Sequence, residues 1–308
     1  MEKHISVLLN ETIDSLNIKS DGTYIDATLG FAGHSSEILK RIPEGRLIAF
    51  DKDKDAVSYS ENRLKSIRDN FKIYNEGFEN IKKRCNEESI KPDGILFDLG
   101  VSSVEIDDAS RGFSYMKDAP LDMRMDQSST KTAKDVVNTY TVEELVKIFR
   151  EYGEEKHALK ISLEIEKERT VKEIETTKEL VEIIDRCYPY KEKRNSHPAK
   201  KVFQAIRIEV NNELDEFERT LRDSLEILNV GGRIAVITFH SLEDRICKKI
   251  FKEVTDINPV IKGMPNIPDD MLPDFKLVTN KPIIPTDLEM RQNSRSKSAK
   301  LRVIEKIK

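Results

Sequence analysis

The chain has 308 residues, of which 38% are hydrophobic and 35% charged, and its formal net charge at neutral pH is −4. No apolar stretch approaches the ~18 residues that a membrane-spanning helix needs, and the amino terminus lacks the pattern of a secretory signal. The three cysteines and five histidines are scattered along the sequence. This composition favours a cytoplasmic protein with reduced thiols and no metal site.

Between residues 24 and 98 the sequence alternates between strand and helix patterns. We expect strands at 24–28, 46–50, 71–74 and 94–98, with helices starting near 33, 53 and 78. Strands that alternate with helices predict βαβ units and a parallel sheet.

The alternation stops after residue 104. Residues 105–132 form a polar stretch too long for an ordinary connection, and 133–187 show only helical periodicity. One further helix is expected from about Pro198 to about Leu228, followed by strands at 232–240 and 300–305. Prolines punctuate 257–289, which predicts a surface excursion. The simplest architecture is therefore an α/β domain formed by 1–104 and 213–308, interrupted by an all-helical insert at 105–212.

Basic residues are concentrated in two stretches, 191–207 and 291–308. The first holds six Lys and Arg and the second seven, against one acid in each. Local charge of this kind suits a polyanion such as RNA, although an ordinary solvated surface is the alternative for either stretch alone.

Polar groups follow three of the expected strands, where parallel strands share one edge and open sheets bind ligands. The first strand leads into a glycine turn, and Asp51 ends the second about 20 residues later, the spacing expected of a cofactor that carries adenosine. The turn is not a full GxGxxG and no phosphate-binding loop is present, which favours S-adenosylmethionine over NAD. Asp26 and Asp98 suit the cationic end of that cofactor, but Asp26 is equally typical of a turn. Phe78 suits either adenine stacking or the core.

Four segments together resemble the RsmH (MraW) family of small-subunit ribosomal RNA cytosine-N4 methyltransferases. They are Asp93 to Ser103, Arg111 to Met116 with Pro120 to Asp126, His197 to Ala199 with Phe203 to Arg207, and Gly231 to Arg233 with Phe239 to Arg245. The resemblance implies a class I S-adenosylmethionine-dependent (Rossmann-like) methyltransferase domain with an inserted helical domain that recognises RNA. It also implies cofactor contacts at Ala32, Gly33, His34, Asp51, Phe78, Asp98 and Glu105.

Two of these positions depart from the family pattern. Ala32 replaces a glycine, which a backbone contact tolerates if φ is negative there. Glu105 replaces a glutamine, so it can accept hydrogen bonds but cannot donate them when ionised.

The activity implied by the resemblance is methylation of N4 of a cytidine in 16S rRNA, at the decoding centre of the small ribosomal subunit. Because the N4 lone pair is delocalised, the reaction needs an acceptor for the amino protons, and Asp98 is the candidate catalytic residue. The base must be held by flat or apolar surfaces. The candidate substrate residues are Phe113, Tyr115, Phe239 and His240 for the base and Arg111 for phosphate. Arg124 is a second candidate phosphate clamp, and Arg207, Arg295 and Lys297 are outlying backbone contacts.

Two other functions stay open from the sequence. One is a DNA amino-methyltransferase, although Asp98-Leu99-Gly100-Val101 lacks the proline-containing signature of those enzymes. The other is a non-catalytic RNA-binding factor in ribosome assembly. The sequence does not fix the oligomeric state, and a homodimer is compatible with it.

Overall fold

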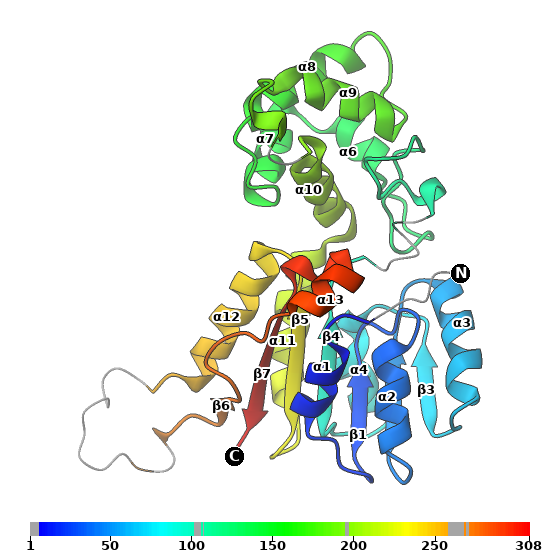
Figure 1. The fold of residues 1–308 in the computed structure, drawn as a ribbon, viewed down its shortest axis with the longest axis vertical. Helices are drawn as coiled ribbons and strands as arrows, with labels where there is room; N and C mark the ends of the chain where they lie inside the picture. Colours follow the sequence, from blue (N-terminus) through cyan, green and yellow to red (C-terminus); the bar gives the residue numbers. More distant parts are fainter. Residues whose placement is uncertain (1–5, 102–105, 107, 195–196, 258–267, 269–270) are drawn as a thin grey trace. The chain divides into compact units, whose positions relative to one another are not determined.

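The computed structural model describes residues 6–101, 106, 108–194, 197–257, 268 and 271–308. Contacts within the chain divide it into two compact units (Figure 1). The sheet unit comprises Met1–Gly100 and Leu214–Lys308, and the insert comprises Val101–Glu213. In the described residues no helix is both long and apolar enough to cross a bilayer.

The described part of the sheet unit contains a seven-stranded sheet with the order β3-β2-β1-β4-β5-β7-β6. The first five strands in chain order run parallel, while β7 is antiparallel to both β5 and β6. Most residues of four of the parallel strands are buried, as expected for strands covered on both faces. The strands are β1 (Thr23–Asp26), β2 (Arg46–Phe50), β3 (Phe71–Tyr74), β4 (Gly94–Asp98), β5 (Arg233–Thr238), β6 (Phe275–Leu277) and β7 (Lys300–Lys306).

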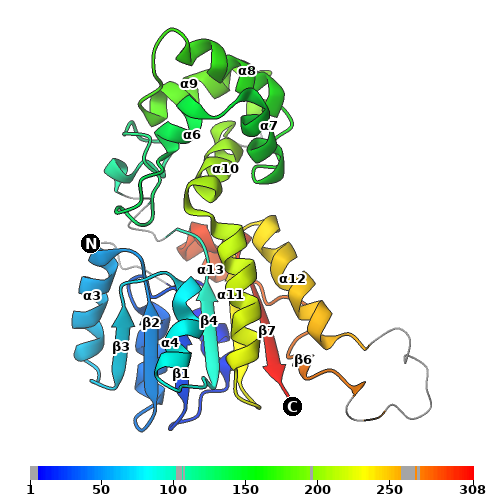
Figure 2. The same cartoon turned by 180° about the vertical axis from the view of Figure 1, so that it is seen from behind.

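Helices cover the two faces of this sheet, and each face has its own hydrophobic core. One face is covered by α1 (Leu9–Leu16), α2 (Gly33–Arg41) and α3 (Lys54–Lys65). The other, seen in Figure 2, is covered by α4 (Ile81–Glu87), α11 (Glu213–Ile227) and α12 (Ser241–Thr255). Successive residues of β1 illustrate the division, because Tyr24 packs into the first core and Ile25 into the second.

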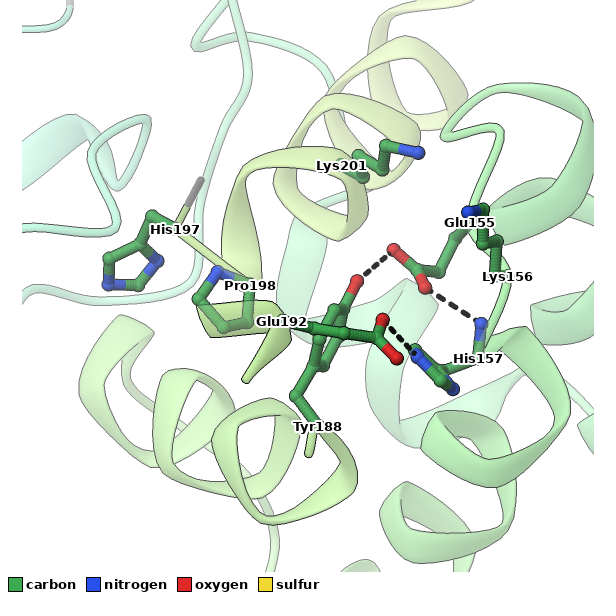
Figure 3. Close-up of a pocket in the computed structure, with 8 residues that line it drawn as sticks. All are labelled: Glu155, Lys156, His157, Tyr188, Glu192, His197, Pro198 and Lys201. Atoms are coloured by element: carbon green, nitrogen blue, oxygen red, sulfur yellow. Dashed lines mark hydrogen bonds and ion pairs between the residues drawn. The ribbon is translucent and has the colours of Figure 1, made fainter. Parts of the chain in front are cut away.

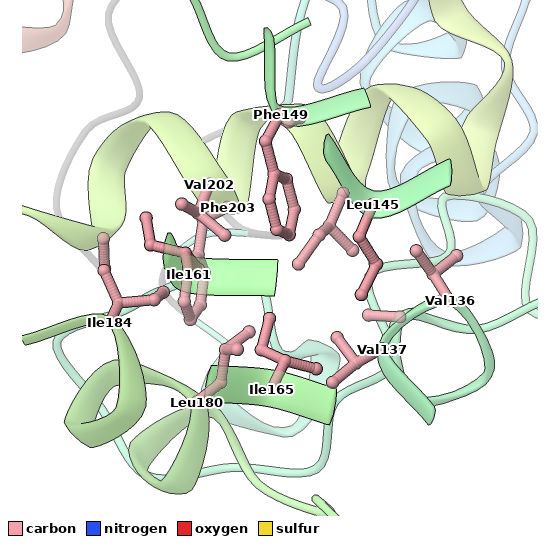
Figure 4. Close-up of a cluster of buried hydrophobic side chains, with 14 of the residues drawn as sticks. Val136, Val137, Leu145, Phe149, Ile161, Ile165, Leu180, Ile184, Val202 and Phe203 are labelled. Carbon is pink, nitrogen blue, oxygen red and sulfur yellow. The ribbon is translucent and has the colours of Figure 1, made fainter. Parts of the chain in front are cut away.

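The insert is built from five helices among its described residues: α6 (Ala133–Thr139), α7 (Val142–Glu151), α8 (Ala158–Arg169), α9 (Thr177–Cys187) and α10 (Ala199–Asn211). Their apolar faces meet in one core, drawn in Figure 4. Thr132, Thr141 and Thr176 begin α6, α7 and α9 with capping boxes, in which the threonine hydroxyl and an acid three residues later satisfy backbone N–H groups at the helix start.

The structure differs from the sequence-based prediction at three places. The single helix expected from Pro198 to Leu228 is two helices, α10 and α11, because Asn212 between them adopts the left-handed conformation with φ 51°. The segment 257–289, expected to be irregular, contains β6 and the start of α13 (Asp287–Gln292). Phe78 opens a short 3₁₀ helix, Phe78–Asn80, rather than α4 itself.

Candidate active site

The strand-end acids Asp26, Asp51 and Asp98 belong to three neighbouring strands of the sheet unit. Asp26 and Asp98 are the last residues of β1 and β4, and Asp51 directly follows β2. The chain passes from β1 to β2 on one side and reaches β4 on the other, so β1 and β4 form the point where the strand order reverses. Open α/β sheets bind their ligands at the carboxyl ends of the strands at such a point.

Asp51 holds the glycine turn against the end of β2. Its Oδ2 accepts from the Gly30 N–H at 2.8 Å, and its Oδ1 accepts from the Asp53 N–H at 2.8 Å. Each carboxylate oxygen can accept a second hydrogen bond, and Asp51 is only half-buried. The carboxylate is therefore fixed in position and can still accept ribose hydroxyls.

The turn does not meet the condition stated for an alanine at position 32, because Ala32 has a φ of +57° rather than a negative one. Its N–H donates to the Leu29 carbonyl at 2.8 Å and it caps α2, so the tight turn requires the left-handed conformation that costs a non-glycine residue about 1–2 kcal/mol. At Gly33 the constraint is different, because a Cβ there would lie 1.8 Å from the Ser6 hydroxyl oxygen. Only glycine allows the amino-terminal segment to approach this closely.

Asp26 is 1% exposed, and both of its carboxylate oxygens accept hydrogen bonds from residues that closely follow it in the chain. Its Oδ1 accepts from the Thr28 N–H at 3.1 Å and its Oδ2 from the Ser35 hydroxyl at 2.6 Å. Burial raises the pKa of this carboxyl, although the hydrogen bonds from Ser35 and Thr28 act in the opposite direction. Of the two alternatives left open by the sequence, the geometry favours the turn residue.

Asp98 differs from Asp26 in having an acceptor atom to spare. Its N–H donates to Thr28 Oγ1 at 2.7 Å, and its Oδ2 lies 3.5 Å from His34 Nδ1. Its Oδ1 is buried and accepts no hydrogen bond from the residues that the structure describes. Burial, together with the charges of Asp26 and Glu243, raises the pKa of Asp98 well above its usual range. Buried acceptors are rarely left without a donor, so Oδ1 fits an N–H group supplied by a ligand.

Phe239 and His240 follow β5, the strand next to β4. Asp98 of β4 pairs in register with Ile237 of β5. A Cβ on Gly100 would lie 3.5 Å from the Phe239 ring, which places that ring beside the end of β4. His240 caps α12, and its Nε2 lies 3.1 Å from Glu243 Oε1.

Sequence reasoning missed Glu243, which is 3% exposed at the start of α12. Its Oε2 accepts from the Phe239 and His240 N–H groups at 2.7 and 3.2 Å. It thereby fixes the backbone at the end of β5 and also adds negative charge near Asp98. The signal was available, because an acid three residues after a helix cap is the spacing of a capping box.

The remaining predicted cofactor residues are His34, Phe78 and Glu105. His34 is buried beside Asp98, and Phe78 is half-buried with its ring 5.8 Å from Phe97 in an edge-on contact. One part of the Phe78 ring therefore belongs to the core and the rest is accessible. Glu105 lies outside the described residues.

The arginines predicted to clamp phosphates have structural partners inside the insert. Arg111 is 8% exposed, and its Nη2 donates to the Arg124 and Met125 carbonyls at 2.9 and 3.0 Å. Arg124 in turn donates to both carboxylate oxygens of Asp122. These guanidinium groups hold the long loop together, and their contact with phosphate stays a prediction.

The aromatic residues predicted to hold the base occupy different environments. Phe113 belongs to the core of the insert, whereas Tyr115 is half-buried and stacks on His197 with the ring centroids 4.6 Å apart. The predicted site residues therefore fall into two groups. Ala32, Gly33, His34, Asp51, Phe78, Asp98, Phe239 and His240 lie in the sheet unit, and Arg111, Phe113 and Tyr115 lie in the insert.

The insert also contains a pocket of about 310 Å³ (Figure 3). Tyr188 donates to Glu155 at one side, and its pKa is raised by burial and by that carboxylate. His157 Nε2 lies 3.0 Å from Glu192 Oε2. The pocket is lined by Glu155, Lys156, His157, Tyr188, Glu192, His197, Pro198 and Lys201. No group of His, Cys, Asp or Glu suited to a metal ion occurs here or elsewhere in the described residues.

The model of the MraW methylase family matches residues 1–307. The chain belongs to the MraW methylase family. Its seven-stranded sheet has the class I methyltransferase arrangement expected from the sequence, and its cofactor is S-adenosylmethionine. This membership confirms the resemblance drawn from the four sequence segments.

Several solved structures are similar to this MraW-family chain. An rRNA methylase from Streptococcus thermophilus is 12% identical, with a TM-score of 0.45 over 99% of this chain and 100% of that one. A putative methyltransferase from Streptococcus mutans in complex with SAH is 13% identical, with a TM-score of 0.43 over 98% and 99%. NSun6 from Pyrococcus horikoshii with SFG is 13% identical, with a TM-score of 0.45 over 98% of this chain and 53% of that one.

Proposed function

We propose that this methyltransferase acts on N4 of a cytidine in 16S rRNA, at the decoding centre of the small ribosomal subunit in the cytoplasm. The observation that carries the proposal is Asp98 Oδ1, a buried acceptor that has no donor among the described residues, at the strand-order reversal of the sheet. An exocyclic amine is a donor of the kind this atom lacks. The family membership and the sequence segments shared with the cytosine-N4 methyltransferases support the choice of cytosine.

The cofactor residues that fit S-adenosylmethionine are those at the ends of β1, β2 and β4. Gly30 and Gly33 allow close approach of the backbone, Asp51 accepts the ribose hydroxyls, and the accessible part of Phe78 contacts adenine. When bound, the cofactor supplies an electrophilic methyl group on a sulfonium. We keep Ala32 and His34 as further contacts on the first turn.

Asp98 performs the proton chemistry in this proposal. The N4 lone pair becomes available for bonding only as the amine loses planarity, and an acceptor aimed at the amino proton favours that change. Positioning of the amine in line with the methyl group supplies the other large contribution, up to ~7–11 kcal/mol in well-oriented reactions. Asp98 must be ionised to accept the proton. Its raised pKa makes it a stronger base than an exposed aspartate.

Candidate RNA contacts occur in each unit. Phe239 and His240 lie at the same sheet edge as Asp98, and Tyr115 offers a half-buried ring on the insert. Arg291 and Lys297 are exposed and suit phosphate contacts. Arg207 is engaged with Glu213 through two hydrogen bonds of 2.8 and 2.9 Å, so we leave it out of the contacts that we propose.

The decisive experiment is mass mapping of 16S rRNA from cells that carry the wild-type gene, a deletion, or the Asp98→Asn variant. We expect the cytidine N4 methyl group to be absent from the deletion strain and from the Asp98→Asn strain, because the amide cannot accept the amine proton as a carboxylate does. The matched control is Asp93→Asn, at the opposite end of β4, where an amide oxygen can still accept from the Thr23 N–H. Normal N4 methylation with Asp98→Asn would overturn the role of Asp98.

The same strains distinguish the alternative functions. If the protein is a non-catalytic assembly factor, rRNA methylation will be unchanged in the deletion strain. Such a factor also need not bind S-adenosylmethionine, and calorimetric titration of the purified protein measures that binding. If the protein is a DNA methyltransferase, the deletion will change the methylation of genomic DNA and leave the methylation of rRNA unchanged.

A further inference from the structure

One peptide group in the sheet unit joins α13 to the buried His34. The Leu8 N–H donates to Glu289 Oε1 at 2.8 Å, and the Val7 carbonyl oxygen lies 3.2 Å from His34 Nε2. These two atoms belong to the same Val7–Leu8 peptide, whose N–H and C=O point in opposite directions because the bond is trans. Glu289 and His34 are therefore linked through a single rigid unit.

This contact determines which imidazole nitrogen of His34 carries the proton. A carbonyl oxygen can only accept a hydrogen bond, so Nε2 must be the donor to Val7. In the neutral ring Nδ1 is then an acceptor, and it lies 3.5 Å from Asp98 Oδ2. Two acceptors that face each other at this distance are favourable only when one proton lies between them.

We propose that His34 is a positioning residue for Asp98, and that Glu289 holds it in this role through the Val7–Leu8 peptide. Nδ1 of His34 and Oδ2 of Asp98 share one proton, which leaves Oδ1 of Asp98 for the substrate amine. The assignment rests on the proposed function of Asp98. Neither Glu289 nor the Val7–Leu8 peptide has a role in the function derived above.

Burial and backbone geometry support the linkage. His34 is 4% exposed and Leu8 is fully buried, so solvent does not compete for the contact between His34 and the Val7 carbonyl. Leu8 adopts φ 51°, a left-handed conformation that is costly for a leucine and is found mainly where surrounding contacts enforce it. The negative charge of Glu289 polarises the peptide and strengthens the acceptor that faces His34.

The charges around Asp98 explain why a shared proton is favoured. Asp26 from β1 and Glu243 from α12 both face Asp98, and with burial they raise its pKa. When the shared proton is absent, the carboxylate also faces the lone pair of Nδ1. The pair is therefore a stronger base than Asp98 alone. It must lose the shared proton before catalysis, and it takes up the proton that the amine gives up when its bond to the methyl group forms.

Nitrogen-15 NMR of the full-length protein with labelled histidine tests the linkage without any methyl transfer. His34 is assigned from the signals lost in His34→Gln. We expect the neutral ring to carry its proton on Nε2, and we expect its ring signals to shift in Asp98→Asn and in Glu289→Ala. A neutral ring protonated on Nδ1 would overturn the proposal. Ring signals of His34 that are unchanged in both variants would also overturn it. Neither result would affect the proposed methylation of cytidine.

Steady-state kinetics provide the second test. The Gln amide of His34→Gln can still donate to the Val7 carbonyl but places no ring nitrogen beside Asp98. We expect kcat to fall about 10- to 100-fold, the range seen when a residue that orients a functional group is lost, with a smaller change in KM for S-adenosylmethionine. The acidic limb of the pH–rate profile should move to lower pH, because the remaining Asp98 is a weaker base than the pair.

Variants of α13 complete the kinetic test. Glu289→Ala should lower kcat and move the acidic limb in the same direction, while Glu289→Gln, which keeps an acceptor for the Leu8 N–H, should stay closer to wild type. Asp287→Ala, an exposed acid on the same helix, is the matched control. An unchanged kcat and acidic limb in both His34→Gln and Glu289→Ala would overturn the role of His34 and Glu289, even if cytidine methylation is confirmed.

Discussion

At the scale of single residues, the contrast between Asp26 and Asp98 shows how the same residue type at the same sheet edge takes different roles. Both carboxyls are strand ends, and burial raises the pKa of both. Asp26 receives hydrogen bonds at both oxygens from its own turn, whereas Asp98 keeps one buried oxygen without a donor among the described residues. The available acceptor, rather than the residue type, distinguishes the candidate catalytic group.

The raised pKa of Asp98 predicts a cost in stability that depends on pH. Because the folded pKa lies above the unfolded value of about 3.9, the native state binds more protons than the unfolded state between the two values, and stability falls as the pH rises through this window. Asp98→Asn removes the ionisable group. We therefore expect the Asp98→Asn variant to be more stable than the wild type at pH 7, with the difference shrinking as the pH falls toward 4.

Urea unfolding of both proteins at several pH values measures this difference. Asp69→Asn, at an exposed carboxyl, is the control and should leave the pH dependence unchanged. A variant of Asp98 that is less stable than the wild type at pH 7 would contradict the electrostatic argument.

At the scale of elements, the sequence indicates where helices start, but it did not indicate where α10 ends. An acid three residues after a threonine is a helix-start pattern that can be recognised in a sequence, and Thr176 begins α9 with such a capping box. The break between α10 and α11 was missed because apolar periodicity continues on both sides of it. Asn is among the few residues that adopt the left-handed conformation without a large penalty, and Asn212 does so.

Substitution of Asn212 tests this interpretation of the break. Asn212 is exposed, so its replacement changes the backbone preference with little change in packing. We expect Asn212→Ala to lower the free energy of unfolding by about 1 kcal/mol, and Asn212→Gly to leave it within about 0.5 kcal/mol of the wild type. Thermal unfolding of the two variants measures the difference. Equal stabilities for Ala and Gly would show that the left-handed conformation is not what ends α10.

At the scale of the whole molecule, the two units keep separate hydrophobic cores. Every residue of the core in Figure 4 lies between Val101 and Glu213, and the two cores of the sheet unit draw on the remaining residues. A cavity in one core should therefore be felt mainly inside its own unit.

Hydrogen exchange of paired variants tests the separation of the cores. Phe149 in α7 and Phe251 in α12 are both almost completely buried, so truncation of either to Ala should cost about 3–5 kcal/mol. We expect Phe149→Ala to accelerate amide exchange in α7, α8 and α10 while the strands stay protected. Phe251→Ala should accelerate exchange in the sheet unit instead. Uniform acceleration in both units by either variant would contradict the separation.

Charge at the same scale predicts how RNA binding depends on salt. Several basic residues of the carboxyl-terminal stretch are engaged within the protein, since Lys300 and Arg302 pair with Asp244, whose pKa they lower against the effect of burial. The exposed Arg291 and Lys297 are the stronger candidates for phosphate contacts. Each contact should contribute about −0.7 to −0.9 to the slope of log K against log salt.

Filter binding of 16S rRNA fragments over a range of salt concentrations measures this slope. We expect Arg291→Glu and Lys297→Glu each to weaken binding and to flatten the slope by about one. Lys65→Glu, on α3 beside Glu61, serves as the surface control. Slopes unchanged by both tail variants would show that this stretch does not contact the RNA.

The sequence by itself determined the class of the fold and the family. The spacing of apolar residues in strands and helices depends on residues that are close in the sequence, and so does the position of an acid at a strand end. Both patterns can therefore be recognised without the structure. Ala32 shows the limit of local reasoning, because its positive φ follows from the closure of a turn that the residue type alone does not impose.

Only the tertiary structure decided what each polar group is bonded to. Arg111 and Arg124, which suit phosphate in the sequence, donate to loop carbonyls and to an acid in the structure. Glu289 and Leu8 meet although 281 positions separate them in the chain. A hydrogen bond requires its two partners within about 3 Å, and sequence separation carries no information about such distances until the chain has packed.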